Sequence, residues 1–257
     1  MKKINSKNAK NLAIGSVVSL SLIAPSFFNC VSYASEINNL ENKNVKISNL
    51  KENGKNISMT INFKQQNEIV DMNIKQIDQD NMEVYTNTNS GESHYLTVNK
   101  NDSFVVMDGE KIPVNKTTFV EKNELTSSEK AAKGAWDPIY VSTGKVEIGN
   151  TIASIGALCT IIGGAIAIAS LAGVSIASSA IASSVSNWAG VVGLGSLAAG
   201  FFFRGDIKYK LYRTKSAVKP PTGPLKTAYR FQDVRSVGTI KGKNMNLLLK
   251  SAGSWWW

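Results

Sequence analysis

The first half of the chain alternates between apolar and polar residues over short stretches. From Ile57 to Phe63 the odd-numbered positions are apolar and the even-numbered ones polar, and shorter runs of the same kind continue to Val114. Clusters rich in Asn, Asp and Gly separate these runs, and Asp108-Gly109 is typical of a two-residue hairpin turn. The pattern predicts an antiparallel meander of five to seven strands over residues 44–120, with one buried face.

A long uncharged run follows this alternating region. The 56 residues from Ile148 to Phe203 include no Asp, Glu, Lys or Arg. Because about 20 apolar residues are enough to span a bilayer, the run predicts two helices, near residues 152–177 and 188–203, with a turn at 183–187. The competing interpretation is a Gly/Ala-rich hairpin buried inside a water-soluble protein. Membrane insertion is favoured, because few residues remain to enclose such a hairpin.

The composition of the uncharged run is typical of a segment that is first soluble in water and later inserts into a membrane. It is rich in Ala, Gly and Ser, and small residues recur at a spacing of four, which lets helices approach closely in lipid. We therefore expect membrane insertion to involve small and aromatic residues of both helices. These are Gly156, Thr160, Gly164, Trp188, Gly193, Phe201, Phe202 and Phe203.

The N-terminal residues predict secretion. Four lysines within the first ten residues precede an apolar core from Leu12 to Ala24. Ser32-Tyr33-Ala34 then places small residues at the two positions that a signal peptidase reads, so we expect cleavage after Ala34. Cys159 is the only cysteine that remains after cleavage, which excludes an internal disulfide bond in the secreted chain.

Charge is distributed unevenly along the chain. Residues 35–135 contain 12 basic and 15 acidic residues, whereas residues 204–257 contain 12 basic and 2 acidic ones. A basic C-terminal part favours an anionic partner, and secretion argues against nucleic acid. We expect binding to anionic membrane lipids or cell-envelope polymers of target bacteria through Arg204, Lys208, Lys210, Arg213, Lys215, Trp255, Trp256 and Trp257. For the three tryptophans, packing on the protein's own strands is an equally open alternative.

The residues that carry catalytic or metal chemistry are sparse. His94 is the only histidine and shares a strand register with Leu96 and Val98, whereas a catalytic base needs an oriented partner. The sequence has no Cys/His cluster with the spacing of metal ligands and no glycine loop of the phosphate-binding kind. We therefore expect a protein that is not an enzyme and that uses no cofactor or metal.

The layout resembles that of the large secreted bacteriocins of the geobacillin type. The resemblance rests on the leader ending in Ser32-Tyr33-Ala34, the stretch from Gly91 to Leu96, the Trp136-Asp137-Pro138 segment and the Ala/Gly-rich run. It implies an unmodified antibacterial protein from a Gram-positive producer.

Together these patterns predict an α+β fold in five segments. They are a signal peptide (1–34), a polar antiparallel β domain (35–120), a linker (121–147), a hydrophobic helical hairpin (148–203) and a basic C-terminal β segment with a Trp-rich end (204–257). The expected function is that of a secreted, cationic antibacterial toxin that binds anionic membranes and permeabilises them by inserting the hairpin, with self-association in the membrane as an option. The alternative is a surface-displayed binding protein that the hairpin anchors in the producer's membrane.

Overall fold

The computed structural model describes residues 40–41, 45–152, 154–174, 176, 178–192, 201–240 and 243–257. The predicted signal peptide with its cleavage site at Ala34 lies outside these residues, and so does Gly193.

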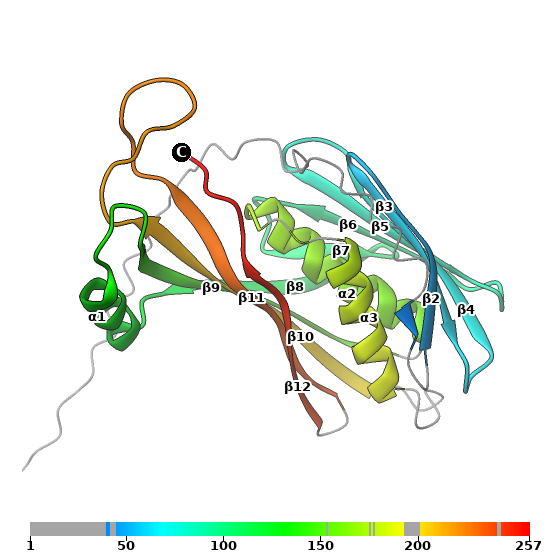
Figure 1. Cartoon of the computed structure of the whole chain (residues 1–257). Coiled ribbons are helices and arrows are strands. Elements are labelled where there is room, and N and C mark those ends of the chain that lie inside the picture. The colour runs from blue at the N-terminus through cyan, green and yellow to red at the C-terminus, as the bar shows by residue number, and fades with distance from the viewer. Residues whose placement is uncertain are drawn as a thin grey trace, which may run out of the picture.

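Twelve antiparallel strands form one sheet, in which the strands follow one another in sequence order (Figure 1). The strands are β1 (Leu40–Glu41), β2 (Val45–Asn53), β3 (Asn56–Phe63), β4 (Glu68–Gln76), β5 (Asn81–Thr88), β6 (Ser93–Asn99), β7 (Phe104–Met107), β8 (Glu110–Phe119), β9 (Pro138–Ile152), β10 (Phe201–Thr214), β11 (Tyr229–Ile240) and β12 (Lys243–Ala252). The helices are α1 (Lys122–Ala131), α2 (Ile155–Leu171) and α3 (Ser178–Val192).

The strands predicted between residues 57 and 114 are present, and their apolar positions face the core. Every second residue of β3 and β5 is buried, as alternation requires when one sheet face is covered. Asp108 and Gly109 join β7 to β8 with φ angles of 53° and 88°. Two successive positive φ values match the backbone twist that a two-residue hairpin needs, which explains the Asp-Gly pair.

The predicted fold class is wrong. We expected an α+β protein with an N-terminal meander, a central helical hairpin and a C-terminal β segment as separate parts. Instead one mostly β fold runs from β1 to β12, and the described residues contain no helical hairpin. Strand β9 connects the two halves, because it pairs with β8 on one side and with β10 on the other and already includes the start of the uncharged run.

The uncharged run is also divided differently from the prediction. The predicted turn at residues 183–187 lies inside α3, and Phe201 opens strand β10 instead of ending a helix. Ser and Asn favour turns, but Asn187 donates a 2.7 Å hydrogen bond from Nδ2 to the Ser183 carbonyl within the helix. Burial of Ile181 and Val185 against the sheet then favours the helix over the turn.

The sheet curves around α2 and α3 (Figure 1). Helix α2 packs on β4, β5 and β6 from the first half of the chain and on β9 and β10 from the second. Helix α3 packs on β2 and β3 near one end of the sheet and on β11 and β12 near the other. It therefore lies between the two ends of the sheet, and the inner strand faces form one apolar core with both helices.

Glycine lets α2 lie directly on the strands. A Cβ atom at Gly163 would lie 2.7 Å from Cγ1 of Val84, and a Cβ atom at Gly164 would lie 3.0 Å from Cδ1 of Leu96. Ordinary carbon contacts are about 3.5–4.0 Å, so a larger side chain at either position would push the helix away from the sheet.

We expect Gly163→Ala to lower the free energy of unfolding by about 1–3 kcal/mol, because the added methyl group overpacks the contact with Val84. Urea denaturation followed by circular dichroism measures this change. Gly134→Ala is the matched control, since the nearest neighbour of its Cβ would lie at 3.7 Å, on Asp137. Equal stability of the two variants would contradict the close contact between α2 and β5.

Candidate functional site

Helix α2 is an apolar, uncharged helix that the sheet encloses. All of its 17 residues except Ser170 are buried. It begins after Ser154, whose Oγ accepts a 3.1 Å hydrogen bond from the Ala157 N–H group, and it ends where Gly173 adopts a φ of 103°. Among the helices within the described ranges, none is long and apolar enough to cross a membrane.

The small-residue face that we predicted for lipid contact lies against the sheet. Gly156, Thr160 and Gly164 all face strands β5 and β6. Thr160 Oγ1 lies 2.7 Å from Thr86 Oγ1 on β5 and 2.9 Å from the Gly156 carbonyl oxygen. Both hydroxyl groups are fully buried, so their hydrogen bond ties the middle of the sheet to α2 where water is excluded.

A second polar contact joins the sheet to the start of α2. His94 on β6 places Nδ1 2.6 Å from Asp108 Oδ2 and Nε2 2.9 Å from Glu92 Oε1. The same Nε2 lies 3.2 Å from Oγ of Ser154, the cap of α2. Each ring nitrogen of His94 therefore faces a carboxylate, and Nε2 also faces the serine hydroxyl. The His94 cluster, as we call these four side chains, therefore links two hairpin turns to the helix cap.

The side chains are linked in the order Ser154, His94, Asp108, as in the catalytic triad of a serine hydrolase. Their hydrogen bonds differ from those of a triad. A triad needs Nε2 free to accept the serine proton, whereas Glu92 lies closer to Nε2 than Ser154 does. Ser154 Oγ is also occupied as an acceptor by the helix cap. Within the described residues, no group of three or more His, Cys, Asp or Glu side chains is arranged to hold a metal ion. The cluster fits a structural link better than a catalytic site.

The predicted basic surface begins on β10, where two of its residues are paired. Arg204 forms an ion pair with Glu147. Lys210 lies 2.8 Å from Glu124 on α1 and 3.5 Å from Asp233 on β11. Burial by itself lowers the pKa of Lys210, but the hydrogen bond to Glu124 and the charges of both carboxylates raise it above its ordinary value. Both side chains therefore form ion pairs within the protein.

The remaining basic residues of the predicted surface differ in what they contact. Lys208 is half-buried on β10. Arg213 donates from Nη1 to the Thr214 carbonyl at 3.1 Å, and Lys215 donates from Nζ to the Ala132 carbonyl at 3.0 Å. Lys215 also lies close enough to the Asp137 carboxylate for its charge to lower the pKa of that group.

The C-terminal tryptophans pack on the protein's own strands. Trp256 exchanges two backbone hydrogen bonds with Tyr229, of 2.7 and 2.8 Å, and its ring centroid lies 4.9 Å from that of Phe231. This favours the packing alternative for Trp256. Trp257, in contrast, remains 41% exposed.

Trp255 connects the C-terminal residues to a distant part of the chain. Its ring meets that of Trp136 edge-on, with centroids 6.1 Å apart. The guanidinium carbon of Arg230 lies 4.3 Å from the Trp255 ring centroid, within range of a cation–π interaction. Nothing in the local sequence indicates the Trp136–Trp255 contact, because more than a hundred residues separate the two rings.

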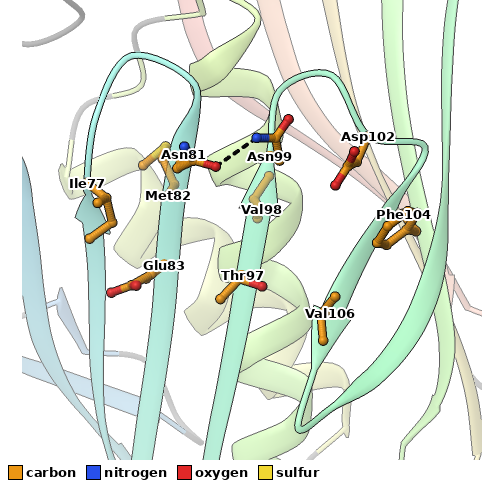
Figure 2. Close-up of a pocket in the computed structure, with 10 residues that line it drawn as sticks. All are labelled: Ile77, Asn81, Met82, Glu83, Thr97, Val98, Asn99, Asp102, Phe104 and Val106. Atoms are coloured by element: carbon orange, nitrogen blue, oxygen red, sulfur yellow. Dashed lines mark hydrogen bonds between the residues drawn. The ribbon is translucent and has the colours of Figure 1, made fainter.

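A pocket of about 250 Å³ lies on the outer face of the sheet, over β5, β6 and β7 (Figure 2). Asn99 donates from Nδ2 to Asn81 Oδ1 at 2.8 Å across its upper part. Glu83 in the same pocket is engaged by the Tyr95 hydroxyl, and this hydrogen bond raises the pKa of Tyr95 to about 12. The lining mixes apolar and amide side chains with the carboxylates of Glu83 and Asp102. These groups do not form a convergent reactive set, so α2 and its contacts remain the stronger candidate.

Comparison with protein-family models, with curated proteins and with solved structures finds no match for this chain.

We expect Cys159 to resist iodoacetamide in the native protein at pH 8. Its side chain is fully buried on α2, and burial raises the pKa of the thiol, so little reactive thiolate forms. Mass spectrometry of samples quenched over time measures the labelling. Fast labelling without denaturant, at the rate of an unfolded control in urea, would contradict the enclosure of α2.

We expect His94→Ala to speed the labelling of Cys159 by about 10- to 100-fold. The change removes the side-chain contacts of His94 with Glu92, Asp108 and Ser154. A hydrogen bond to a charged group contributes about 1.5–3 kcal/mol. When opening and reclosing are fast compared with the reaction of the exposed thiol, the labelling rate reports the free energy of local opening. Thr97→Ala, on the outer face of the same strand, is the control. An unchanged rate in His94→Ala would show that the His94 cluster does not hold α2.

Proposed function

We propose that this chain is a secreted, membrane-active antibacterial protein that keeps its apolar helix α2 enclosed by the sheet and exposes it at an anionic membrane. The observation that carries the proposal is an uncharged helix with 16 of its 17 residues buried, packed against strands from both halves of the chain. An apolar helix of this kind aggregates in water unless other surfaces cover it.

The helix is the element best suited to leave the fold. A helix satisfies its backbone hydrogen bonds internally, so it enters lipid without unpaired N–H and C=O groups, whereas a strand taken from the sheet loses its partners. The polar links described above, at Thr160 and at Ser154, are short-range contacts that separation breaks. A bilayer then replaces the apolar surroundings that the sheet supplies.

The connection between Thr86 and Thr160 offers a direct test, because their hydroxyl oxygens lie 2.7 Å apart. Thr86→Cys and Thr160→Cys together should form a disulfide bond, which needs Cβ atoms about 3.5–4.5 Å apart. Cys159→Ala in the same chain, taken from Ser35 onward, avoids wrong pairing. We expect the oxidised protein to release no dye from phosphatidylglycerol vesicles and the reduced protein to release it.

Two controls make the test specific. The variant with Thr86→Cys and Cys159→Ala is treated with the same oxidant. It should release dye from the vesicles in both its oxidised and its reduced form. His94→Ala should permeabilise vesicles at lower protein concentration than the wild-type chain, because its link to α2 is absent. Equal leakage from the oxidised and reduced double-cysteine protein would exclude release of α2. A wild-type chain that neither leaks vesicles nor kills Gram-positive cells would overturn the proposed function as a whole.

A further inference from the structure

Three segments that are far apart in the sequence meet at one end of the sheet. They are residues 135–137, residues 215–228 between β10 and β11, and residues 253–257. The Ser216 N–H group donates to the Ala135 carbonyl at 3.3 Å, and the backbone pairing of Tyr229 with Trp256 joins the third segment to the second. Figure 1 shows the 215–228 loop beside the C-terminus at this end. We call the surface that they form the docking end.

The docking end combines exposed apolar side chains with basic ones. Leu225 is 61% exposed, Trp136 47% and Trp257 41%. Lys219 and Lys226 are exposed on the loop that carries Leu225. The chain between Asp206 and Asp233 holds seven basic residues and no acidic one, so the loop carries positive charge that its own neighbours in sequence do not neutralise.

The loop is built to hold its tip away from the sheet. Val218 and Lys226 exchange two backbone hydrogen bonds, of 2.8 and 3.0 Å, which close the base of the loop. The tip between them contains three prolines, and Gly223 turns the chain with a φ of 95°. Proline has no N–H group, so this tip brings few unpaired donors into an apolar environment.

We propose that the docking end seats the protein on anionic phospholipid bilayers. This inference rests on the proposed function and adds the surface that meets the membrane first. Leu225 and Trp136 enter the interfacial layer, where tryptophan is enriched, while Lys219 and Lys226 lie among the lipid phosphates. The docking end includes Lys215 and the tryptophans 255–257 of the predicted basic surface, but not Arg204 and Lys210, which are paired on β10.

A bilayer fits the docking end better than a soluble polyanion does. A polymer in water neutralises the lysines but leaves Leu225 and Trp136 in contact with solvent. A bilayer engages both kinds of side chain at once, because its anionic headgroups attract the lysines and its interface accepts the apolar side chains. The pairing of exposed apolar and basic residues therefore selects lipid as the partner.

Flotation with vesicles of phosphatidylglycerol or phosphatidylcholine tests the charge contribution. We expect the Lys219→Glu, Lys226→Glu double variant to bind phosphatidylglycerol vesicles at least about 25-fold more weakly than the wild-type chain, since each basic residue near the surface contributes about fivefold. Lys51→Glu with Lys75→Glu is the matched control. It makes the same change in net charge at exposed positions on β2 and β4, and it should reduce binding far less.

A matched pair of variants tests the contribution of apolar side chains to vesicle binding. Leu225→Ser should weaken binding to both vesicle types, whereas Leu248→Ser, at a position 47% exposed on β12, should not. Thermal unfolding of each variant verifies that the fold is intact.

Docking-end variants that bind weakly but release dye at raised protein concentration would support this surface as a separate first step. Variants that bind like the wild-type chain, while that chain leaks vesicles, would overturn the docking end and leave the proposed function standing. A wild-type chain that does not bind would overturn both.

Discussion

The close contact between α2 and strands β4, β5 and β6 is the interaction on which the rest of the structure depends. A helix without a charged residue has no face that prefers water, so it requires cover on all sides. Gly163 and Gly164 bring its backbone onto the strands, where Met72, Val84 and Leu96 fill the space that missing side chains leave. Strands β9 and β10 cover another side of the same helix. The chain therefore folds as one body, because neither half of the sheet encloses α2 alone.

Sequence patterns predict the local features of this fold well. Alternation from Ile57 to Phe63 sets which side chains of β3 face inward, and Asp108-Gly109 sets a turn, because both depend on residues that are neighbours in the chain. The enclosure of α2 depends on contacts between residues about eighty positions apart, such as Val84 and Gly163. The small-residue spacing indicates that something lies close to the helix, but it does not distinguish a strand from a second helix.

The mistaken expectation of a helical hairpin has an identifiable cause. The prediction assumes that too few residues remain to enclose an apolar segment. A strand, however, supplies an inward side chain at every second position, and twelve strands supply a large inner surface. Charge counts have a similar limit, because they do not separate paired from unpaired groups. On β10, Arg204 forms an ion pair with Glu147 and Lys210 lies 2.8 Å from Glu124, so two of the four basic side chains of this strand are neutralised. Exposed lysines that form no ion pair with any described residue lie instead where the chain leaves the sheet, at Lys219 and Lys226.

The position of α3 suggests the order in which the enclosure would open. Helix α3 packs against strands from both ends of the sheet, so α2 stays covered on that side as long as α3 is in place. Ser184 Oγ on α3 is buried, with no hydrogen-bond partner within the described part of the chain, and such a group costs about 1–3 kcal/mol. On α2, by contrast, the Thr160 hydroxyl is satisfied by Thr86 and by the Gly156 carbonyl. Displacement of α3 would let water satisfy the Ser184 hydroxyl. It would also uncover α2 on that side while the sheet keeps its hydrogen bonds.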